Sequence, residues 1–345
     1  MNMIPQSAST GHATRLAARP TVPVAVIVTA HGSARYLPQA LAAVRDQTVA
    51  SAETVVVDDT WPEADVIQIT EAAGATRVRH PLSPNVARNV AVLETRQPWI
   101  AFLDSEDTWV PHKLEAQWRA VEACPGLDVV FANFWEVSAV HGITRPFLEQ
   151  KAHYWAVERR EIAPGVKECE PRSLVRQFLK GNFLPRSTLL VRRDMLVRVG
   201  LFDRELIHLE DRDCWLRLLA VARFGVLEEP LMYGRLDVDD SDQDRRRWPY
   251  EEAVDAARLW QLMAAHPNEY PPEALALYAA ERWRPSLAVG RLAEADGLLH
   301  DARRHYLRAW WLGGGIWPLI RAATSYLPEP IRARLLAARA HLRGA

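Results

Sequence analysis

The sequence predicts an α/β protein with a mostly parallel central sheet between layers of helices, followed by an all-helical C-terminal region. Between residues 22 and 135, short β-branched runs alternate with longer segments of helical periodicity. The short runs are almost wholly apolar, which is typical of strands covered on both faces. From about residue 250 onward only helical periodicity remains. The length of 345 residues and the apolar content of 49% predict one large domain, or a domain of about 240 residues plus a smaller one.

Five strands are predicted in the α/β part, and four helices are predicted between them. The strands cover residues 24–29, 54–59, 76–80, 99–104 and 128–134. The helices fall within residues 36–48, 62–74, 85–96 and 112–124. Each helix has apolar residues at helical spacing, as Leu114, Trp118 and Val121 illustrate in the last of them. This order is expected where helices connect neighbouring parallel strands.

Polar residues follow three of the predicted strands. His31 comes after the first strand, Asp58 and Asp59 end the second, and the acidic stretch Asp104–Asp107 ends the fourth. In an open parallel sheet, a ligand binds outside the carboxyl ends of the strands. The sequence therefore predicts a binding site formed by these residues.

The acidic stretch Asp104–Asp107 suggests how a nucleotide would be bound there. The first turn reads TAHGSARY, and the chain contains neither GxGxxG nor GxxxxGK[ST], so no glycine-rich loop is available for phosphates. A divalent cation held by the acids would neutralise a diphosphate instead. The alternative is that these acids only cap the helix that begins near Pro111. Three acids within four residues repel one another and a cap needs only one, which favours the cation.

Composition excludes several other classes of protein. Lys and Arg number 42 against 43 Asp and Glu, so no overall basic field attracts nucleic acid. The three cysteines are odd in number and widely spaced, as expected for reduced thiols in the cytoplasm. No apolar run of about 18 residues is present, and residues 1–20 lack the apolar middle of a signal peptide. We expect residues 1–21 to be a flexible tail.

A second acidic group opens the predicted helix at Leu209–Leu218. Glu210 and Asp211 fall in its first turn, where the positive end of the helix dipole favours carboxylates. Trp215 and Leu216 would bury the opposite side of the helix. From the residues alone, an ordinary acidic first turn explains this pattern equally well.

Five motifs in order resemble those of glycosyltransferase family 2 enzymes with the GT-A fold. They are VAVIVTAHGSARYLPQALAAVRDQT, VVVDD, ARN at 87–89, WIAFLDSEDTWVPHKLEAQ and STLLVRRDMLVRVGLFDRELIHLEDRDCWLRL. The resemblance covers residues 22 to about 240. It implies a GT-A domain at 22–245, divided into a nucleotide-sugar-binding half at 22–135 and an acceptor half at 136–245, and leaves a helical region at 246–345. It also implies inverting transfer of a sugar from a nucleoside diphosphate, with UDP expected, to an acceptor hydroxyl.

The triplet Asp104-Ser105-Glu106 matches the DxD motif of this family. The resemblance implies that Asp104 and Ser105 lie at the donor, and that Asp104 with Glu106 or Asp107 binds Mn²⁺ or Mg²⁺. The third position is Glu here, which is longer than Asp by one methylene. The choice between Glu106 and Asp107 as metal ligand therefore stays open.

The resemblance implies further donor contacts at the ends of the first two strands and in the third helix. These are Thr29, Ala30, His31, Asp58, Asp59 and Arg88. A guanidinium group suits a diphosphate because its planar fork donates two hydrogen bonds. The sequence departs from the family pattern at two places, where Thr60-Trp61 replaces the common Gly-Ser and Pro84 replaces a glycine.

The acidic pair Glu210-Asp211 matches the acceptor-side pair of the family. The resemblance implies that Asp211 is the general base and that Glu210 positions the acceptor. Inversion needs one base that removes the acceptor proton as the hydroxyl attacks opposite the leaving diphosphate. The acceptor would be a glycan, a lipid-linked molecule or a small molecule. Its other predicted contacts are Arg186, Ser187 and Trp215.

The helical C-terminal region is predicted to break at 266–268 and to bury its tryptophans, Trp260, Trp283, Trp310 and Trp311. From Ala302 to Ala345 there are eight arginines and one acid. The last predicted helix, within 330–345, has an apolar face and an arginine face. It would lie on an anionic membrane surface, or its arginines would extend over the core from an exposed helix.

Two hypotheses for the whole chain follow. In the first, it is a metal-dependent inverting glycosyltransferase in the cytoplasm, with peripheral contact at the inner membrane face left open. In the second, the GT-A scaffold has lost turnover through its departures at positions 60, 106 and 237, and acts as a nucleotide-sugar-binding partner. The retained Asp104, Arg88 and Glu210-Asp211 favour the enzyme. A nucleotidyltransferase would need the missing glycine-rich loop, and the oligomeric state is not predicted.

Overall fold

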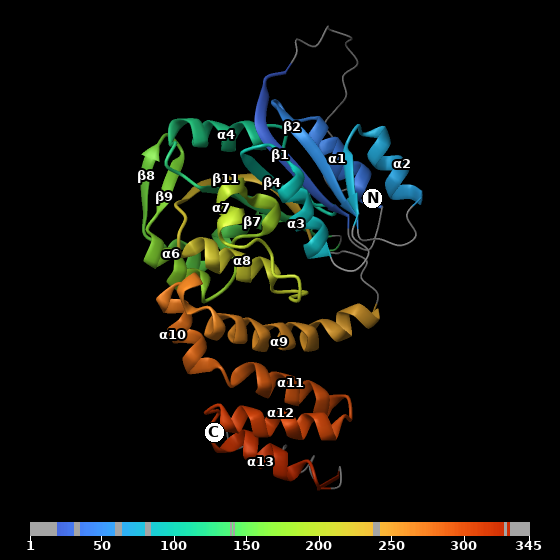
Figure 1. The fold of residues 1–345 in the computed structure, drawn as a ribbon, viewed down its shortest axis with the longest axis vertical. Coiled ribbons are helices and arrows are strands. Elements are labelled where there is room, and N and C mark those ends of the chain that lie inside the picture. The colour runs from blue at the N-terminus through green and yellow to red at the C-terminus, as the bar shows by residue number, and fades with distance from the viewer. Residues whose placement is uncertain are drawn as a thin grey trace. The chain divides into compact units, whose positions relative to one another are not determined.

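The computed structural model describes residues 19–30, 35–58, 64–79, 84–138, 140, 142–236, 242–327 and 330–331. These residues form two compact units. The first contains the described residues up to 205 together with 210–236 and 269–273, and the second contains 206–209, 242–268 and the described residues from 274 onward. Figure 1 shows the α/β elements of the first unit and the helices of the second.

The first unit is built around one mixed sheet. Its strands are β1 (Thr21–Ala30), β2 (Ala50–Asp58), β3 (Thr76–Arg79), β4 (Trp99–Asp104), β5 (Thr108–Trp109), β6 (Val129–Ser138), β7 (Gly142–Pro146), β8 (Arg159–Ala163), β9 (Val166–Cys169), β10 (Leu190–Arg192) and β11 (Phe224–Arg235). The strand order is β3-β2-β1-β4-β10-β6-β11-β9-β8, with β5 paired to β11 and β7 paired to β6. The first four strands in this order are parallel, and β10 is antiparallel to both of its neighbours.

Helices flank this sheet (Figure 1). They are α1 (Leu37–Arg45), α2 (Ala64–Ala72), α3 (Pro84–Glu94), α4 (Lys113–Ala123), α5 (Ala152–Trp155), α6 (Pro171–Phe178), α7 (Arg193–Arg198) and α8 (Glu210–Leu219), with short 3₁₀ turns η1 (Phe147–Gln150) and η2 (Arg186–Thr188). The predicted α/β class is confirmed. The five predicted strands are β1, β2, β3, β4 and β6, and the four predicted helices are α1 to α4.

Strand β1 shows why the apolar runs form the centre of the sheet. All residues from Val24 to Ala30 are buried, although successive side chains of a strand point to opposite faces. Both faces of β1 are therefore covered. Its parallel partners β2 and β4 end at the same edge, which places the polar residues after these strands beside one another.

The second unit is helical and contains α9 (Asp242–Ala265), most of α10 (Pro272–Glu281), α11 (Arg284–Ala295), α12 (Leu299–Trp311) and α13 (Ile316–Thr324), with the 3₁₀ turn η3 (Pro267–Glu269) after α9. The predicted break at 266–268 coincides with the end of α9 and with η3. Asp255 of α9 accepts hydrogen bonds from the backbone N–H groups of Ile207, His208 and Leu209, which ties this segment to the unit. Among the described residues, no helix combines the length and the apolar character needed to cross a bilayer.

The prediction that Trp310 and Trp311 are buried is wrong, because these side chains are exposed. Helix α12 packs through Ala302, Tyr306 and Ala309, which are fully buried. The two tryptophans therefore lie away from its packed face. Of the predicted C-terminal helix, residues 332–345 lie outside the described part of the chain, as do residues 1–18 of the predicted tail.

Candidate active site

The candidate site is formed at the carboxyl ends of β2, β1 and β4. The register places Thr29 opposite Asp104 and Ala30 opposite Asp58, so four predicted site residues are neighbours in the sheet. Asp58 is fully buried and accepts a hydrogen bond from Arg77 Nη1 at 3.0 Å. The buried Thr29 hydroxyl has no hydrogen-bond partner among the described residues. The predicted donor contacts His31 and Asp59 lie outside the described residues.

A tight turn follows β4 and carries the acidic stretch. The Ser105 N–H donates to the Thr29 carbonyl oxygen at 3.0 Å, and the Asp107 N–H donates to the Asp104 carbonyl oxygen at 3.0 Å. The Asp104 N–H donates to Ser187 Oγ at 2.9 Å. These bonds connect the turn to β1 and to η2, so the backbone that carries the carboxylates is held on both sides.

Ser187 is buried between the acidic turn and Trp109. Its burial bears on the acceptor contact predicted for it. Its hydroxyl accepts from the Asp104 backbone, and its carbonyl oxygen accepts from Trp109 Nε1 at 3.0 Å. Its polar atoms thus support the acidic turn. Burial leaves no surface for the acceptor contact that the sequence predicted for Ser187.

Arg186 connects the two acidic groups of the site. Its Nε and Nη2 donate to Asp104 Oδ1 at 3.1 and 2.9 Å, and its Nη1 donates to Glu210 Oε1 at 2.9 Å. Only 15% of its side chain is exposed. Burial alone would lower its pKa, but Asp104 and Glu210 outweigh this effect and raise the pKa of Arg186. Asp104 and Glu210 therefore share one cation. The predicted acceptor contact of Arg186 stays a prediction.

Helix α3 supplies a second cation to Glu210, at the same oxygen atom that Arg186 contacts. Arg88 is buried, and its Nη1 donates to Glu210 Oε1 at 3.3 Å and to Asn85 Oδ1 at 2.7 Å. Burial, together with the charge of Arg186, lowers the pKa of Arg88 to about 10, so it stays a cation at neutral pH. In this arrangement Arg88 neutralises Glu210. The predicted contact of Arg88 with the donor remains a prediction.

The same face of α3 positions the loop before α8. Asn89 Nδ2 donates to the Phe202 carbonyl oxygen at 2.8 Å, and its Oδ1 accepts from the Phe202 N–H at 3.1 Å. Asn85 Nδ2 donates to the Asp203 carbonyl oxygen at 3.1 Å. Residues three or four positions apart share a helix face, so the spacing of Asn85 and Asn89 could have indicated that they contact the same segment. Their contacts with the loop before α8 were not predicted.

Asp211 lies beside this paired cluster in the first turn of α8. Its Oδ2 accepts a hydrogen bond from Asn182 Nδ2 at 3.4 Å, and its Oδ1 accepts from the Arg212 N–H. Burial, followed by the charge of Glu210, raises the pKa of Asp211 to about 6. A carboxylate with this pKa is ionised at neutral pH and is a stronger base than an ordinary Asp.

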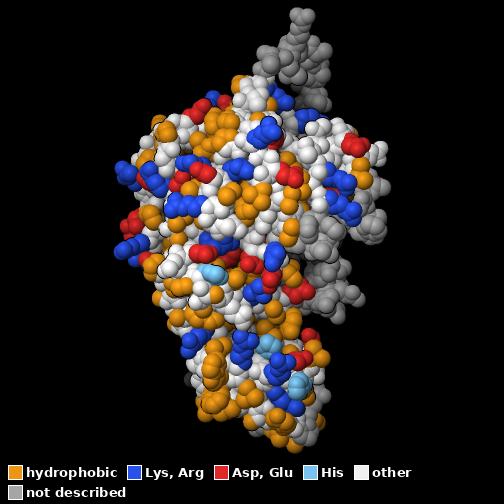
Figure 2. Space-filling model, in the orientation of Figure 1, with side chains coloured by type: hydrophobic (Ala, Val, Ile, Leu, Met, Phe, Trp, Pro, Cys, Tyr) orange, Lys and Arg blue, Asp and Glu red, His pale blue; other side chains and the backbone are white. Residues whose placement is uncertain are grey.

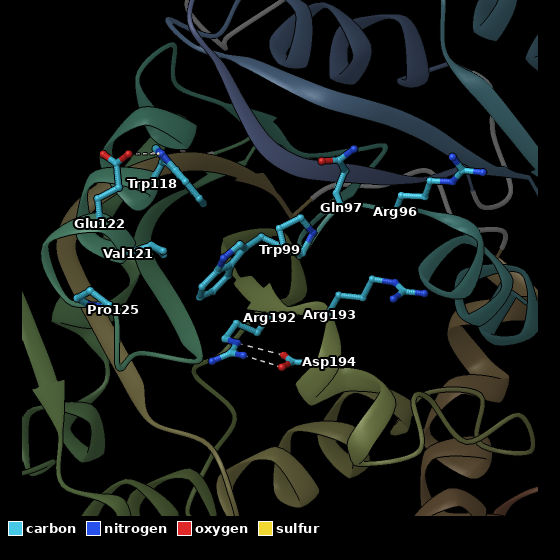
Figure 3. Close-up of a pocket in the computed structure, with 11 residues that line it drawn as sticks. Arg96, Gln97, Trp99, Trp118, Val121, Glu122, Pro125, Arg192, Arg193 and Asp194 are labelled. Atoms are coloured by element: carbon cyan, nitrogen blue, oxygen red, sulfur yellow. Dashed lines mark hydrogen bonds and ion pairs between the residues drawn. The ribbon is translucent and has the colours of Figure 1, made fainter.

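Trp215, a predicted acceptor contact, is fully buried beneath this turn. Its ring packs against Phe102 of β4 at 6.4 Å and against Phe202 at 5.8 Å between centroids. The side chain therefore anchors α8 to the core, and the predicted acceptor contact of Trp215 is corrected. A separate pocket of about 510 Å³ lies at the opposite end of β4, and none of the predicted site residues lines it. Figure 3 shows its lining residues, among them Trp99 and Trp118.

The fit of the acidic turn to a divalent cation rests on the chemistry of its side chains. Burial, followed by the charge of Asp104, raises the pKa of Glu106, and burial with the charge of Glu106 raises the pKa of Asp107 well above its usual value. Carboxylate oxygens are the ligands that Mn²⁺ and Mg²⁺ prefer, and a cation would relieve this repulsion. Within the described part of the chain, no three His, Cys, Asp or Glu side chains are arranged to hold a metal ion.

The chain is similar to known proteins in both sequence and fold. A model of the family Glycosyl transferase family 2 matches residues 25–169. An uncharacterized glycosyltransferase of Haemophilus influenzae is 23% identical over 263 residues, which cover 72% of this chain and 84% of that protein. Residues 25–169 are therefore similar to the domain of this glycosyltransferase family.

Solved structures show the same fold. The S. aureus TarS 1-349 structure in complex with UDP-GlcNAc has a TM-score of 0.52 at 17% identity, with 88% of this chain and 89% of that chain covered. The mannosyltransferase PcManGT from Pyrobaculum calidifontis, in complex with GDP-Man and Mn²⁺, has a TM-score of 0.50 at 17% identity, with 94% and 81% covered. A longer S. aureus TarS chain is covered over 54% of its length. The chain therefore has the fold of these solved structures, and its residues 25–169 match the Glycosyl transferase family 2 model.

Proposed function

We propose that this protein is a metal-dependent inverting glycosyltransferase that moves a sugar from a nucleoside diphosphate to an acceptor hydroxyl. The observation that carries the proposal is the cluster in which Arg186 joins Asp104 at the end of β4 to Glu210 at the start of α8. These residues are far apart in the sequence but adjacent in the fold. Donor-side and acceptor-side groups thus meet in one place, as a single displacement step requires.

Asp211 is the proposed general base. It would remove the proton of the acceptor hydroxyl while the oxygen attacks the anomeric carbon opposite the leaving diphosphate. Its pKa of about 6 suits this role, because the group is ionised at neutral pH yet binds a proton more readily than an ordinary Asp. Glu210 is already paired with two arginines, so it would position the acceptor rather than accept its proton.

The acidic turn is the proposed place of the Mn²⁺ or Mg²⁺ ion. Asp104 with Glu106 or Asp107 would hold the cation, which when bound supplies the positive charge that stabilises a leaving diphosphate. Asp104 is paired with Arg186. The pKa values of Glu106 and Asp107 are raised by burial and by the neighbouring carboxylates. The choice between Glu106 and Asp107 as the second ligand is tested by the variants below.

For the donor, we propose a UDP-sugar, held at the ends of β1, β2 and β4 by the residues predicted there. One neighbour in fold binds UDP-GlcNAc, and another binds GDP-Man with Mn²⁺. The acceptor is proposed to be a glycan, a lipid-linked molecule or a small molecule, and the reaction is placed in the cytoplasm. Residues 22–245 would form the catalytic domain, with its donor half at 22–135.

Donor binding with and without Mn²⁺ tests this proposal on Glu106→Ala and Asp107→Ala. UDP-GlcNAc and GDP-Man serve as probes in calorimetric titrations of the full chain. We expect Mn²⁺ to tighten binding of one probe to the wild type at least ten-fold, and Glu106→Ala to lose most of this gain because a carboxylate ligand is missing.

Glu122→Ala is the matched control, since Glu122 is an exposed acid that hydrogen-bonds Trp118 of α4 and does not belong to the site. It should behave as the wild type. If only Asp107→Ala loses the Mn²⁺ effect, the ligand is Asp107. If the wild type binds donor equally with and without metal, the metal-dependent mechanism is contradicted.

A further inference from the structure

Helices α12 and α13 are joined by a glycine turn within the sequence WWLGGGIW, residues 310–317. Gly313 and Gly315 have φ angles of 98° and 71°, which side chains other than glycine rarely adopt. A Cβ atom on Gly314 would lie 2.7 Å from the Ala309 carbonyl oxygen. The turn therefore requires its glycines, and it places the end of α12 next to the start of α13.

This turn presents large apolar side chains to solvent. Trp310, Trp311, Ile316 and Trp317 are 45%, 78%, 61% and 41% exposed. We call these four residues the aromatic turn. Exposed apolar side chains continue from it along both helices, at Leu307, Ile320, Tyr326 and Leu327. Figure 2 shows hydrophobic side chains along the lower end of this view, over α12 and α13, with arginines and histidines among them. A gathering of this size usually marks an interaction site.

The buried side of the same helices shows that this exposure belongs to a well-packed structure. Ala293, Ala302, Tyr306 and Ala322 form a core between α11, α12 and α13. Glu294 of α11 accepts hydrogen bonds from the Tyr306 hydroxyl and from Arg321 Nη1. The three helices are thus joined by both apolar packing and a buried polar network. Among the described residues, the aromatic turn lies outside this packing.

The charge around the aromatic turn has one sign. Between Ala302 and Leu327 the sequence contains four arginines and neither Asp nor Glu. Arg304 and Arg308 are exposed on α12, and neither forms an ion pair with a described residue. Arg303 lies over the ring of Tyr326, with 3.8 Å from its Cζ atom to the ring centroid. The surface combines tryptophan, tyrosine and unpaired arginine, which are the residues enriched where proteins enter the headgroup layer of a membrane.

This charge also argues against a second copy of the chain as the occupant. A symmetric dimer would place the same patch against itself. Arg304 and Arg308 would then face identical arginines with no acid in the segment 302–327 to compensate them. An anionic bilayer supplies both the opposite charge and an apolar layer for the tryptophans.

We propose that the aromatic turn and its flanking arginines form a docking surface for anionic membranes. The tryptophans would enter the boundary between headgroups and acyl chains, while Arg304 and Arg308 contact lipid phosphates. This surface differs from the predicted helix within 330–345 and does not depend on the proposed reaction. It would keep the protein at a membrane surface without a spanning helix.

Cosedimentation of the full chain with vesicles tests this proposal. Vesicles of phosphatidylcholine alone are compared with vesicles containing an equal amount of phosphatidylglycerol. We expect the wild type to bind only the anionic vesicles, with a blue shift of tryptophan fluorescence and weaker binding at high salt. The variants Trp311→Ser/Trp317→Ser and Arg304→Glu/Arg308→Glu should each bind at least ten-fold more weakly. All four side chains are exposed, so the melting temperature should stay within a few degrees of the wild-type value.

The matched control is Trp155→Ser, because Trp155 is 46% exposed in the first unit, far from the aromatic turn in the sequence. It should bind vesicles as the wild type does. The proposal is overturned if the wild type ignores anionic vesicles, or if both double variants bind as tightly as the wild type. It is also overturned if the wild type sediments as a dimer that the tryptophan double variant dissociates, since the surface would then join two copies.

Discussion

Replacing Asp211 by Asn is expected to lower the rate of sugar transfer by about a thousand-fold, because a positioned general base contributes roughly 10²–10⁴ in rate. The substitution keeps the shape of the side chain, and the new amide oxygen can still accept the hydrogen bond that Asn182 Nδ2 donates. Donor affinity should therefore stay within a few-fold of the wild-type value. Initial rates and donor titrations of the two proteins, measured side by side, give both quantities.

The pKa of Asp211 adds a pH dependence and a stability test to this prediction. Because the base must be ionised, transfer by the wild type should rise as the pH increases through about 6. The raised pKa means that folding favours the protonated carboxyl, so ionised Asp211 opposes folding above pH 6. At pH 8 the Asn variant should thus melt at the same temperature as the wild type or higher. A lower melting temperature together with lost donor binding would show that Asp211 is structural and not the base.

Replacing Arg186 by Ala is expected to destabilise the first unit by about 3–5 kcal/mol, the usual cost of removing one partner of a buried ion pair. Asp104 and Glu210 both lose hydrogen bonds from the same guanidinium group. Urea unfolding measures the change in the free energy of unfolding. Arg186→Lys keeps the charge but cannot reach both acids with the same fork, so it should recover only part of the loss.

Arg160→Ala is the matched control for Arg186. Arg160 also pairs with a carboxylate, Glu168, at 3.0 Å, but its side chain is 77% exposed. Exposed pairs contribute about 0–1 kcal/mol, so this variant should unfold almost as the wild type does. Equal losses for Arg186→Ala and Arg160→Ala would contradict the view that Arg186 holds the two halves of the site together.

The parallel half of the fold could be predicted because its strands are continuous apolar runs. Strand β4 has the predicted bounds, since it is buried along most of its length and stops at its first acid. Strands β8 and β9 escaped prediction because they form an antiparallel pair at one end of the sheet and carry charged residues such as Arg160 and Lys167. Antiparallel strands can leave one face to water, so they lack the apolar run that identifies a strand covered on both faces.

For the site, the sequence revealed the acids but not their partners. Asp104 and Glu210 stand out at a strand end and a helix start, whereas Arg186 joins them across 82 and 24 residues, respectively. Only the fold determines such a pairing. Similarly, periodicity placed Trp310 and Trp311 on a helix but did not indicate which face of that helix a neighbour covers.

The measurement that tests the central claim most directly is a thermal-shift screen of the full chain against UDP, GDP, TDP and CDP and their common sugars, each with and without Mn²⁺ or Mg²⁺. Ligands that bind only the folded state raise the melting temperature in proportion to the logarithm of concentration over Kd, so donor selectivity is readable without an acceptor. A metal-dependent rise with UDP and its sugars is the predicted result. If no donor shifts the melting temperature with either metal, the site at β4 and α8 is not that of a working transferase, and the chain would instead be a GT-A scaffold without turnover.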